Sequence, residues 1–587
     1  MSETVMPDKN SLSNFCMAPD LLLSRSSQTT RSNKTGDWRF VRPVYRDKTA
    51  PCSVACPAGE DIPRIEMLAA RGQFQAAWDV IMQENPFPAV CGRVCFHPCE
   101  GACNRSDFDT PLAIHHVERS IGVHALEKGL TPSTEPAARK KKRIAIVGSG
   151  PSGLSAAYFL NRLGYESHVY EAREEAGGLL RWGIPEYRLP RAILAAEISR
   201  LEGLGVHVHC KTPVARDILD ARDTDHHAVF VGCGHAHYVF PGIQGQELMV
   251  DGLEYLRSVR AGTAQDVSGD VAVIGGGNAA IDVARTLIRG HARVYILYRR
   301  RIVDMPAFER EREAALVEGL TIMELVAPVA VEAAGNRIRL TVQAMQMSGE
   351  DAGDGRARVV PKGDATETLT VDKVVAATGA EADPAWAPST GAGPGRLNMS
   401  HCLFEERGIP IIYGGDLMSP VLSIPHAVMS GKQAAMALDT YFQSGMDAVI
   451  PRLEACRIGK GPIVSMETYC QGKARQNNSQ AVTFADIKGD MFSVAKRQEP
   501  PELSPELRIK SFSPVEACLS RESAVQEAGR CFNCGMCNGC GYCSVFCPEM
   551  AVVPGEPNTI NLDFCKGCGI CVEECPRNAM HLETEAP

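Results

Sequence analysis

Eight cysteines near the C-terminus fall into two runs of identical spacing that could hold iron–sulfur clusters. The first run is Cys537, Cys540, Cys543 and Cys547, before Pro548; the second is Cys565, Cys568, Cys571 and Cys575, before Pro576. In two-cluster bacterial ferredoxins, the fourth cysteine of each such run ligates the other cluster. We therefore expect one [4Fe-4S] cluster on Cys537, Cys540, Cys543 and Cys575, and a second on Cys565, Cys568, Cys571 and Cys547. The doubled spacing with proline argues against the alternative, a pair of four-cysteine zinc sites.

Two further groups of cysteines could hold additional metal centres. Cys531 and Cys534 directly precede the first run, and six others lie near the N-terminus: Cys52, Cys56, Cys91, Cys95, Cys99 and Cys103. Six cysteines are too few for two four-cysteine clusters and too many for one. Because the 23 cysteines are concentrated in these groups, they indicate metal ligands in a reducing, cytoplasmic compartment rather than disulfides.

The first of two glycine-rich motifs has the surroundings of a dinucleotide-binding loop. Its glycines are Gly148, Gly150 and Gly153, which follow the apolar run "RIAIVG" and open a helical pattern. Such glycines let the backbone approach a pyrophosphate at the helix N-terminus. Glu171 ends the next predicted strand, where a carboxylate can accept from a ribose hydroxyl. This context predicts a dinucleotide site, with a purely structural glycine turn as the alternative.

The second motif repeats this pattern but lacks the acidic residue. It comprises Gly275, Gly277, Asn278 and Ala280, and Tyr298 stands where the acid would be. Three arginines follow: Arg299, Arg300 and Arg301. Basic residues at this point suit a 2′-phosphate, which favours NADP(H) over NAD(H) without deciding between them. The alternative is that the arginines form a solvated strand end or pair with Glu309 and Glu311.

Two such motifs, with "GGD" containing Gly415 and Asp416 further on, predict a flavin domain interrupted by a nicotinamide domain. Hydride exchange between the two cofactors would need no protein acid or base, so no catalytic residue is assigned. No cysteine lies between Cys233 and Cys402, so a redox-active dithiol cannot carry electrons away, and Cys233 alone suggests a packing residue. Electrons would then leave through iron–sulfur centres.

These motifs predict an α/β multidomain fold. We expect a flexible arm (1–45), a helical Fe–S domain (46–138), an FAD-binding domain (141–255 and 391–450), an inserted NAD(P)-binding domain (256–390), a linking excursion (451–528) and an α+β bacterial-type ferredoxin domain (529–587). The nucleotide-binding domains are both expected to be Rossmann-like, with further buried strands within 372–379 and 410–416. The chain has 587 residues and a net charge of −9, which argues against nucleic-acid binding, and no 18-residue apolar run predicts a membrane span.

Several segments between about residues 50 and 440 resemble the glutamate synthase small subunit and the N-terminal half of dihydropyrimidine dehydrogenase. They include "PCSVACPAGEDIP", "NPFPAVCGRVCFHPCEGAC", "PLAIHHVERSIG", "GGLLRWGIPEYRLP", "GGGNAAIDVA" and "YRRRIVDMPA". The resemblance implies FAD binding near Gly178 and Leu179, and two [4Fe-4S] clusters in the N-terminal domain. One would use Cys56, Cys95, Cys99 and Glu118, whereas Cys91 and His97 would lie beside it without serving as ligands.

The resemblance also gives Cys531 and Cys534 a role. In the family, Cys52 and Cys103 would share a cluster with two cysteines of an "EAxRCLxC" motif that precedes the first cluster segment. Residues 20–51 contain no cysteine, but "AVQEAGRCFNCG" at 524–535 matches this motif. We therefore expect Cys531 and Cys534 to complete the cluster of Cys52 and Cys103; a structural or adventitious role is the alternative. The count is then four [4Fe-4S] clusters, one FAD and NADP or NAD.

Every recognisable module moves electrons, so we expect an electron-transfer flavoprotein without a substrate site of its own. The resemblance favours a subunit that links NAD(P) to a thiamine-diphosphate 2-oxoacid oxidoreductase, of the 2-oxoglutarate or phenylglyoxylate type. The alternatives are a free-standing NAD(P)H:ferredoxin oxidoreductase, a glutamate synthase small subunit, and a flavin-based redox sensor or scaffold, which no regulatory motif supports.

Overall fold

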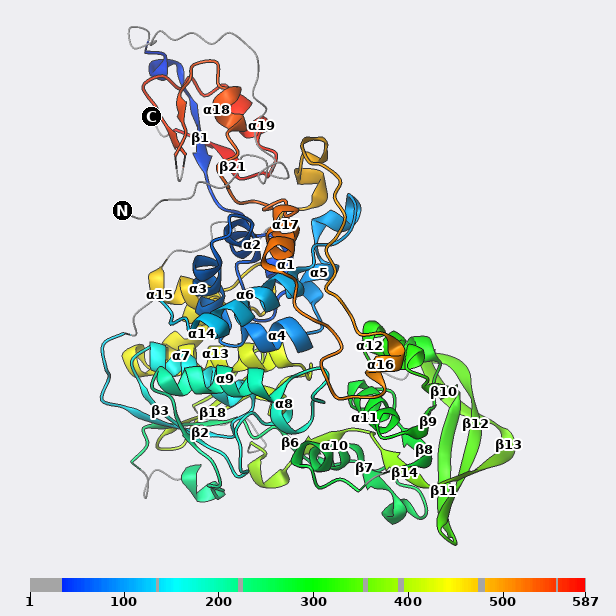
Figure 1. The fold of residues 1–587 in the computed structure, drawn as a ribbon. Coiled ribbons are helices and arrows are strands. Elements are labelled where there is room, and N and C mark those ends of the chain that lie inside the picture. The colour runs from blue at the N-terminus through cyan, green and yellow to red at the C-terminus, as the bar shows by residue number, and fades with distance from the viewer. Residues whose placement is uncertain are drawn as a thin grey trace.

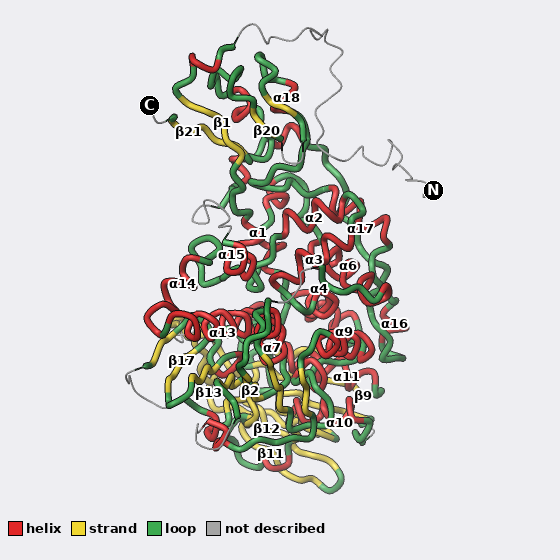
Figure 2. Tube along the Cα trace, turned by 90° about the vertical axis from the view of Figure 1, so that its left-hand side faces the viewer, coloured by secondary structure: helices red, strands yellow, loops and turns green. Residues whose placement is uncertain are grey.

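Three regions follow one another along the molecule (Figure 1). The ferredoxin-like segment lies at one end, a helical domain in the middle, and two sheet-containing domains at the other end, where most strands gather (Figure 2). The computed structural model describes residues 34–133, 137–219, 225–265, 267–351, 357–388, 395–472, 481–555 and 558–585. Within these ranges, no helix has both the length and the apolar character needed to cross a bilayer.

Six helices build the domain in the middle. They are α1 (Pro51–Ala55), α2 (Ile62–Ala70), α3 (Phe74–Glu84), α4 (Pro88–Val94), α5 (Pro98–Gly101) and α6 (Ile114–Lys128). Four of them carry proline in the first turn, where its missing N–H removes no helical hydrogen bond. Helices α4 and α6 cross closely, since a Cβ on Gly92 or Gly122 would lie 2.6 or 2.5 Å from the facing helix. This crossing brings Cys91 and Glu118 close enough to interact electrostatically.

A seven-stranded sheet forms the core of the first nucleotide-binding domain. In spatial order its strands are β16 (Arg396–Asn398), β17 (Leu403–Glu406), β18 (Pro410–Tyr413), β5 (Ala228–Val231), β2 (Arg143–Val147), β3 (Glu166–Tyr170) and β4 (His207–His209). The last five are parallel, and β18, β5 and most of β2 are buried apolar runs, as expected for a sheet covered on both faces. Helices α7 (Pro151–Arg162) and α13 (Ile424–Ser444) pack together over one face, with α8 (Leu179–Trp182) and α9 (Arg191–Gly203) nearby (Figure 1).

A second, parallel sheet forms the inserted domain. Its order is β10 (Thr321–Glu324), β9 (Ala292–Tyr298), β8 (Gly269–Ile274), β14 (Lys373–Ala376) and β7 (Val250–Asp251). It is flanked by α10 (Gly252–Ala261), α11 (Asn278–Arg289) and α12 (Glu309–Val317), and by an antiparallel sheet of β11 (Val326–Ala334), β12 (Arg337–Asp351) and β13 (Ala357–Val371). The short pair β6 (His235–Tyr238) and β15 (Ala380–Ala382) joins the two domains. Because β7 already belongs to the second sheet, the crossing precedes Val250 rather than falling at 255.

The ferredoxin-like domain contains a strand from the opposite end of the chain. Its own elements are α18 (Tyr542–Val545), β19 (Val552–Val553), β20 (Thr559–Ile560), α19 (Ile570–Glu573) and β21 (Met580–Thr584). Strand β1 (Val41–Tyr45) pairs antiparallel with β21, with Val41 opposite Thr584. The expectation of a flexible arm over 1–45 is therefore wrong for its last five residues, and residues 1–33 lie outside the described part. The pairing is stabilised by a partner more than 500 residues away, which no local sequence pattern announces.

The segment between the sheet domains and the ferredoxin-like domain, expected at 451–528, packs along the helical domain. Its helices are α14 (Val449–Ala455), α15 (Met466–Gln471), α16 (Pro505–Arg508) and α17 (Arg521–Gly529). Thr49 bridges to Ala481, and the Asn104 side chain donates to the carbonyl of Val482 at 3.0 Å. Helix α17 then packs between α2 and α6. The cysteines that follow α17 are thus delivered to the N-terminal domain.

Candidate functional site

Four thiols from the two ends of the chain surround one cavity, which we call the linking site. They are Cys52, Cys103, Cys531 and Cys534. The rest of the wall is mainly apolar and includes Ile62, Leu112, Ile114 and Phe532. Burial raises the pKa of all four thiols, for Cys534 to about 12, and none forms a disulfide. Thiolate-type donors around a dry cavity fit an iron–sulfur cluster, whose charge would stabilise the deprotonated form.

A buried network fixes the end of α17 against the N-terminal domain. The Arg530 guanidinium donates to the Glu527 carboxylate at 2.6 Å and to the carbonyl of Thr110 at 2.8 Å. Glu527 also accepts from the backbone N–H of Ala113 at 2.8 Å. Since both charged groups are almost fully buried and paired, they hold Cys531 in position beside the N-terminal cysteines.

Two amide groups donate to thiols of the linking site. The Asn104 side chain lies 3.4 Å from the sulfur of Cys534, and the backbone N–H of Asn533 lies 3.3 Å from that of Cys531. Hydrogen bonds of this kind stabilise the charge of a cluster and tune its potential. The position of Asn104 directly after Cys103 was not singled out from the sequence.

The second N-terminal set comes together beside the linking site. The electrostatic neighbours of Cys95 are Cys56, Glu118 and Glu60, and those of Cys99 include Cys56 and Cys95. The pKa of Glu118 lies well above its ordinary value because the carboxyl is buried and faces other carboxyls. Glu60, which sequence reasoning missed, has its pKa raised by burial to about 7.

Asn85 connects these two carboxyls. Its amide donates to Glu60 at 2.8 Å and to Glu118 at 3.1 Å, and its oxygen faces the thiol of Cys91 at 3.7 Å. Cys91 thus lies next to the set and contacts the amide. His97 contributes its backbone N–H to the Cys95 sulfur at 3.3 Å, rather than its ring, which stacks on His115.

Helical spacing places the two N-terminal sites one turn apart. Cys52 of the linking site and Cys56 of the second set are joined by a backbone hydrogen bond of 3.0 Å at the end of α1. Cys99 and Cys103 have the same four-residue separation across α5. A four-residue step along a helix rises about 6 Å, so each pair supplies neighbouring sites.

The eight cysteines of the two C-terminal runs line two small cavities. As their spacing predicts, each cavity is lined by three cysteines of one run and by the fourth cysteine of the other. One cavity, the inner site, is lined by Cys537, Cys540, Cys543 and Cys575. The other, the outer site, is lined by Cys547, Cys565, Cys568 and Cys571. The N-terminal segment contacts both sites: the Tyr45 hydroxyl at the end of β1 lies 3.1 Å from the Cys543 sulfur, and Arg39, just before β1, donates to the carbonyl of Cys565 at 2.8 Å. Neither contact was foreseen, because both residues fall within the expected arm.

The first glycine motif has the geometry of a phosphate-binding turn. Gly148 has φ +95°, and a Cβ on Gly153 would lie 2.0 Å from the Gly148 carbonyl oxygen. By contrast, a Cβ on Gly150 would meet nothing within 4 Å, which leaves room for a ligand beside the N-terminus of α7. The Glu171 carboxylate accepts from the backbone N–H groups of Ser149 at 3.1 Å and Arg173 at 2.9 Å, at the end of β3.

Two other predicted segments converge on this turn. Gly178 has φ +53°, and its Cβ would lie 2.8 Å from the Cα of Gly150, while Leu179 beside it is exposed. A Cβ on Gly415 would lie 2.8 Å from the Ser152 hydroxyl, which is buried and has no hydrogen-bond partner among the residues that the structure describes. Burial raises the pKa of the adjacent Asp416. An orphaned hydroxyl within a glycine cradle fits a dinucleotide such as FAD.

The second glycine motif also leaves room for a ligand at the N-terminus of a helix. Gly275 has φ +142° and a Cβ on Gly277 would meet nothing within 4 Å, whereas Ala280 is fully buried and the Asn278 side chain accepts from the Phe308 N–H at 2.9 Å. These features fit a nicotinamide dinucleotide at the N-terminus of α11.

Two of the three arginines at the strand end contact other parts of the protein. Arg300 is buried and directs its Nε to the carbonyl of Ala357 at 3.2 Å, and Arg301 pairs with Asp304 at 2.8 Å. Glu311, considered as a partner, binds Arg188 and Arg285 instead. Arg299 is exposed beside Tyr298, and its role toward a 2′-phosphate stays a prediction.

Cys233 is half-buried, and burial raises the pKa of its thiol to about 12. A reactive thiol needs a lowered pKa, so this environment supports the packing role.

Three families match successive parts of the chain. Residues 45–130 match dihydropyrimidine dehydrogenase domain II with its 4Fe-4S cluster, residues 142–393 match pyridine nucleotide-disulphide oxidoreductases, and residues 558–581 match a 4Fe-4S binding domain. These matches cover the helical domain, both nucleotide-binding motifs and the second cysteine run of the ferredoxin.

Curated relatives agree with this division. The beta subunit of the NADP(+)-dependent formate dehydrogenase of Moorella thermoacetica is 34% identical over 83% of this chain and 70% of its own length. Subunit PreT of the NAD-dependent dihydropyrimidine dehydrogenase of Escherichia coli K12 is 31% identical over 67% of this chain and 91% of its own. The beta subunit of the Geobacter sulfurreducens NADPH-Fe(3+) oxidoreductase is 35% identical over 58% of this chain, and the match spans about half of that relative.

Among solved structures, Mycobacterium tuberculosis FprA in complex with NADPH aligns with a TM-score of 0.42 and 18% identity, over 52% of this chain and 84% of its own. The sequence relatives and family matches, together with the geometry above, identify FAD, NAD(P) and [4Fe-4S] clusters as the cofactors. The chain is an FAD-dependent NAD(P)H oxidoreductase with iron–sulfur centres, and it belongs to the family that includes the beta subunit of NADP(+)-dependent formate dehydrogenase and the PreT subunit of NAD-dependent dihydropyrimidine dehydrogenase.

Proposed function

We propose that this chain is the electron-transfer subunit of a larger oxidoreductase complex. It moves electrons between NAD(P)(H) and a partner through one FAD and four [4Fe-4S] clusters, held by the ligand sets described above. The observation that carries the proposal is the linking site, because thiols from both ends of the chain surround one cavity. A bound flavin supplies the exchange of hydride on the nicotinamide side and of single electrons on the cluster side.

The residues of this chain set the order of the proposed path. Cys52 and Cys56 place the second N-terminal site and the linking site one helical turn apart, as do Cys99 and Cys103. Cys534 of the linking site is three residues from Cys537 of the inner site, so their Cα atoms lie at most about 11 Å apart. Cys547 follows the inner-site cysteines in sequence but lines the outer site, and Cys575 follows the outer-site cysteines but lines the inner site. Each step between clusters therefore joins sites that share a short covalent segment.

The outer site is the proposed exit toward the partner. It lies in the domain at the far end of the molecule from the inserted nucleotide-binding domain (Figure 1). Cys568, one of its four thiols, is exposed, whereas the thiols of the linking site are buried or half-buried. An exposed cluster ligand shortens the distance to an electron acceptor docked on that face.

The proposed partner is a thiamine-diphosphate 2-oxoacid oxidoreductase of the 2-oxoglutarate or phenylglyoxylate type. The second candidate is a formate dehydrogenase, favoured by the relative that matches 83% of this chain. Anaerobic purification of the native complex separates them: the co-purifying subunits are identified, and reduction of NAD and NADP is measured with each 2-oxoacid and with formate. A fully active monomer that reduces only soluble ferredoxin would contradict the subunit role.

The ligand assignment is tested by replacing Cys531 and Cys534 together with serine. The double variant should lose one cluster of four, so that anaerobic iron falls from about 16 to about 12 atoms per chain. Cys470→Ser is the matched control, since this cysteine is exposed and belongs to none of the sites. Full iron in the double variant would overturn the linking site. Zinc in place of iron would overturn its electron-carrying role.

A further inference from the structure

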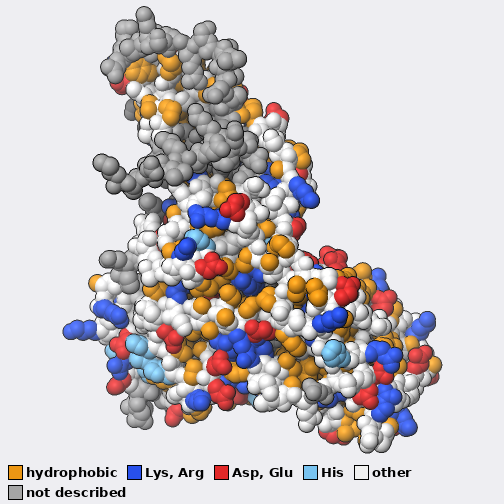
Figure 3. Space-filling model, viewed as in Figure 1, with side chains coloured by type: hydrophobic (Ala, Val, Ile, Leu, Met, Phe, Trp, Pro, Cys, Tyr) orange, Lys and Arg blue, Asp and Glu red, His pale blue; other side chains and the backbone are white. Residues whose placement is uncertain are grey.

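A group of histidines gathers at the edge of the flavin-domain sheet, and none of their side chains belongs to a site described above. Five of the fifteen histidines of the chain belong to it: His168, His207, His209, His226 and His227. The space-filling view shows histidine side chains together on the surface over β3 (Figure 3). Strands β3 and β4 are parallel and in register, with His168 beside His207, so their alternate side chains share one face. The proposed electron path uses none of them.

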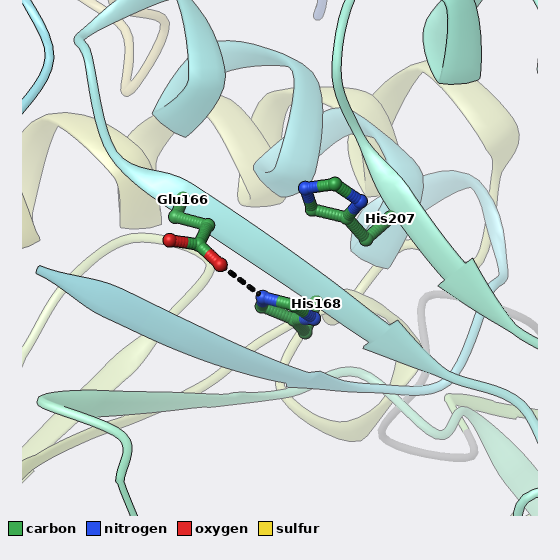
Figure 4. Close-up of side chains that lie close together, drawn as sticks. All are labelled: Glu166, His168 and His207. Carbon is green, nitrogen blue, oxygen red and sulfur yellow. Dashed lines mark hydrogen bonds and ion pairs between the residues drawn. The ribbon is translucent and has the colours of Figure 1, made fainter.

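Three of the side chains have the separations of metal ligands (Figure 4). A carboxylate oxygen of Glu166 lies 2.8 Å from Nε2 of His168, and a ligand atom from each of Glu166, His168 and His207 lies within 4.8 Å of the other two. Two ligands of a tetrahedral zinc ion lie about 3.3 Å apart, given bonds of about 2.0–2.1 Å. The contact between Glu166 and His168 is within about half an ångström of that spacing, and exposed His207 can rotate to complete the set.

The surroundings orient the central ring. Nδ1 of His168 lies 3.0 Å from Nε2 of His209, and the two rings are parallel within 2°. A metal-binding histidine commonly has its other nitrogen held by such an outer partner, which fixes its orientation and tautomer. His226 lies near the same ring, with the two ring centroids 6.2 Å apart, and its Nε2 is 3.1 Å from the Tyr170 hydroxyl.

One positive side chain, Arg143, contacts the proposed ligands, and it can move aside without losing every acidic partner. Arg143 donates to the same Glu166 oxygen at 3.1 Å and must turn away when an ion binds. It has a second acidic partner in Asp225, at 3.8 Å, and its side chain is 44% exposed, so this movement leaves no buried charge unpaired.

We propose that Glu166, His168 and His207 bind a divalent transition-metal ion of the zinc class. Imidazole nitrogen with one carboxylate is a ligand set that such ions prefer over Mg²⁺ or Ca²⁺. The ion joins β4 to β3. Because β4 is a three-residue edge strand, a metal link to its neighbour stabilises the pairing at this edge.

The test uses the anaerobically purified, cofactor-loaded chain with one equivalent of Zn²⁺. X-ray absorption at the zinc edge should show nitrogen and oxygen ligands at about 2.0–2.1 Å, and calorimetry should show at least tenfold weaker binding in His207→Ala. His209→Ala should weaken binding by about 10- to 100-fold through loss of the outer partner. Flavin and iron content, measured in each variant, check that the fold is intact.

The matched control is His237→Ala. His237 forms an exposed pair with Asp383 at 3.3 Å but belongs to a different strand. Its replacement should therefore leave the affinity for the one bound Zn²⁺ ion unchanged. Zinc–sulfur distances near 2.3 Å would place the ion on cysteines and overturn the proposal. Equal affinity in wild type and His207→Ala would do the same.

Discussion

A fully buried ion pair joins the flavin domain to the helical domain, and its two halves should differ in importance. Lys432 of α13 lies 2.6 Å from the Glu84 carboxylate at the end of α3, and both side chains are at most 1% exposed. Lys432 also donates to the carbonyl of Ala58. Glu84 accepts three further hydrogen bonds, from the Ser465 hydroxyl at 2.6 Å and from two backbone N–H groups of the first turn of α15 at 2.9 and 3.1 Å.

These contacts set the size of the effect. Removing one partner of a buried pair costs about 3–5 kcal/mol because the other charge stays uncompensated. In Lys432→Met, Glu84 keeps three donors, so we expect a loss near 3 kcal/mol. In Glu84→Met, Lys432 keeps one carbonyl and three donors lose their acceptor, so the loss should reach about 5 kcal/mol. The double variant should lose less than the sum of the two.

Hydrogen exchange of the α13 amides, measured by mass spectrometry on the loaded protein, reports this local stability. A loss of about 3 kcal/mol corresponds to roughly 150-fold faster exchange, and Glu84→Met should exchange at least tenfold faster again. Lys488→Met is the control, because its pair with Glu573 is largely exposed and should contribute less than about 1 kcal/mol. Equal rates in the two buried-pair variants, or a Lys432→Met rate within threefold of wild type, would refute this reasoning.

Three further outcomes are expected. Gly153→Ala should lose most of its flavin, measured by absorbance after unfolding, since its Cβ meets a backbone oxygen at 2.0 Å; Gly203→Ala, with no atom within 4 Å, should retain it. Tyr45→Phe removes the hydroxyl that faces the Cys543 sulfur, so one cluster should shift to a lower midpoint potential in an EPR-monitored redox titration, and an unchanged titration would contradict that contact's role. Arg299→Ser should reduce kcat/KM for NADPH by about tenfold and leave that for NADH unchanged; equal losses would show that the arginine does not read a 2′-phosphate.

The chemistry-bearing motifs were predictable because their constraints are local. Gly148 and Gly275 need positive φ, and the glycine spacing alone announces such turns. The cysteine runs place their thiols within a few residues of each other. The partnership of Cys531 with Cys52 was predictable only through a displaced motif, since nothing in the spacing of either segment refers to the other.

What escaped prediction depends on contacts between distant segments. Strand β1 is five residues long and is stabilised by β21, so no local periodicity distinguishes it from a disordered arm. The Nε of buried Arg300 contacts a carbonyl of β13, and the raised pKa of Glu60 depends on its burial and on the nearby Glu84 carboxylate. Sequence reasoning singled out Arg300 but missed β1 and Glu60, because it had no access to their environments.

The ligands of the linking site also become available at very different times during synthesis of the chain. Asn104, beside Cys103, contacts Cys534 across 430 residues of chain. At about 5–20 residues per second, a ribosome needs roughly 20 to 90 seconds to cover that distance. Throughout this interval the N-terminal half of the ligand set is folded or folding without its partners. We therefore expect insertion of the proposed cluster to be a late event, and a ribosome that stalls before residue 531 to leave two thiols without their partners and open to oxidation.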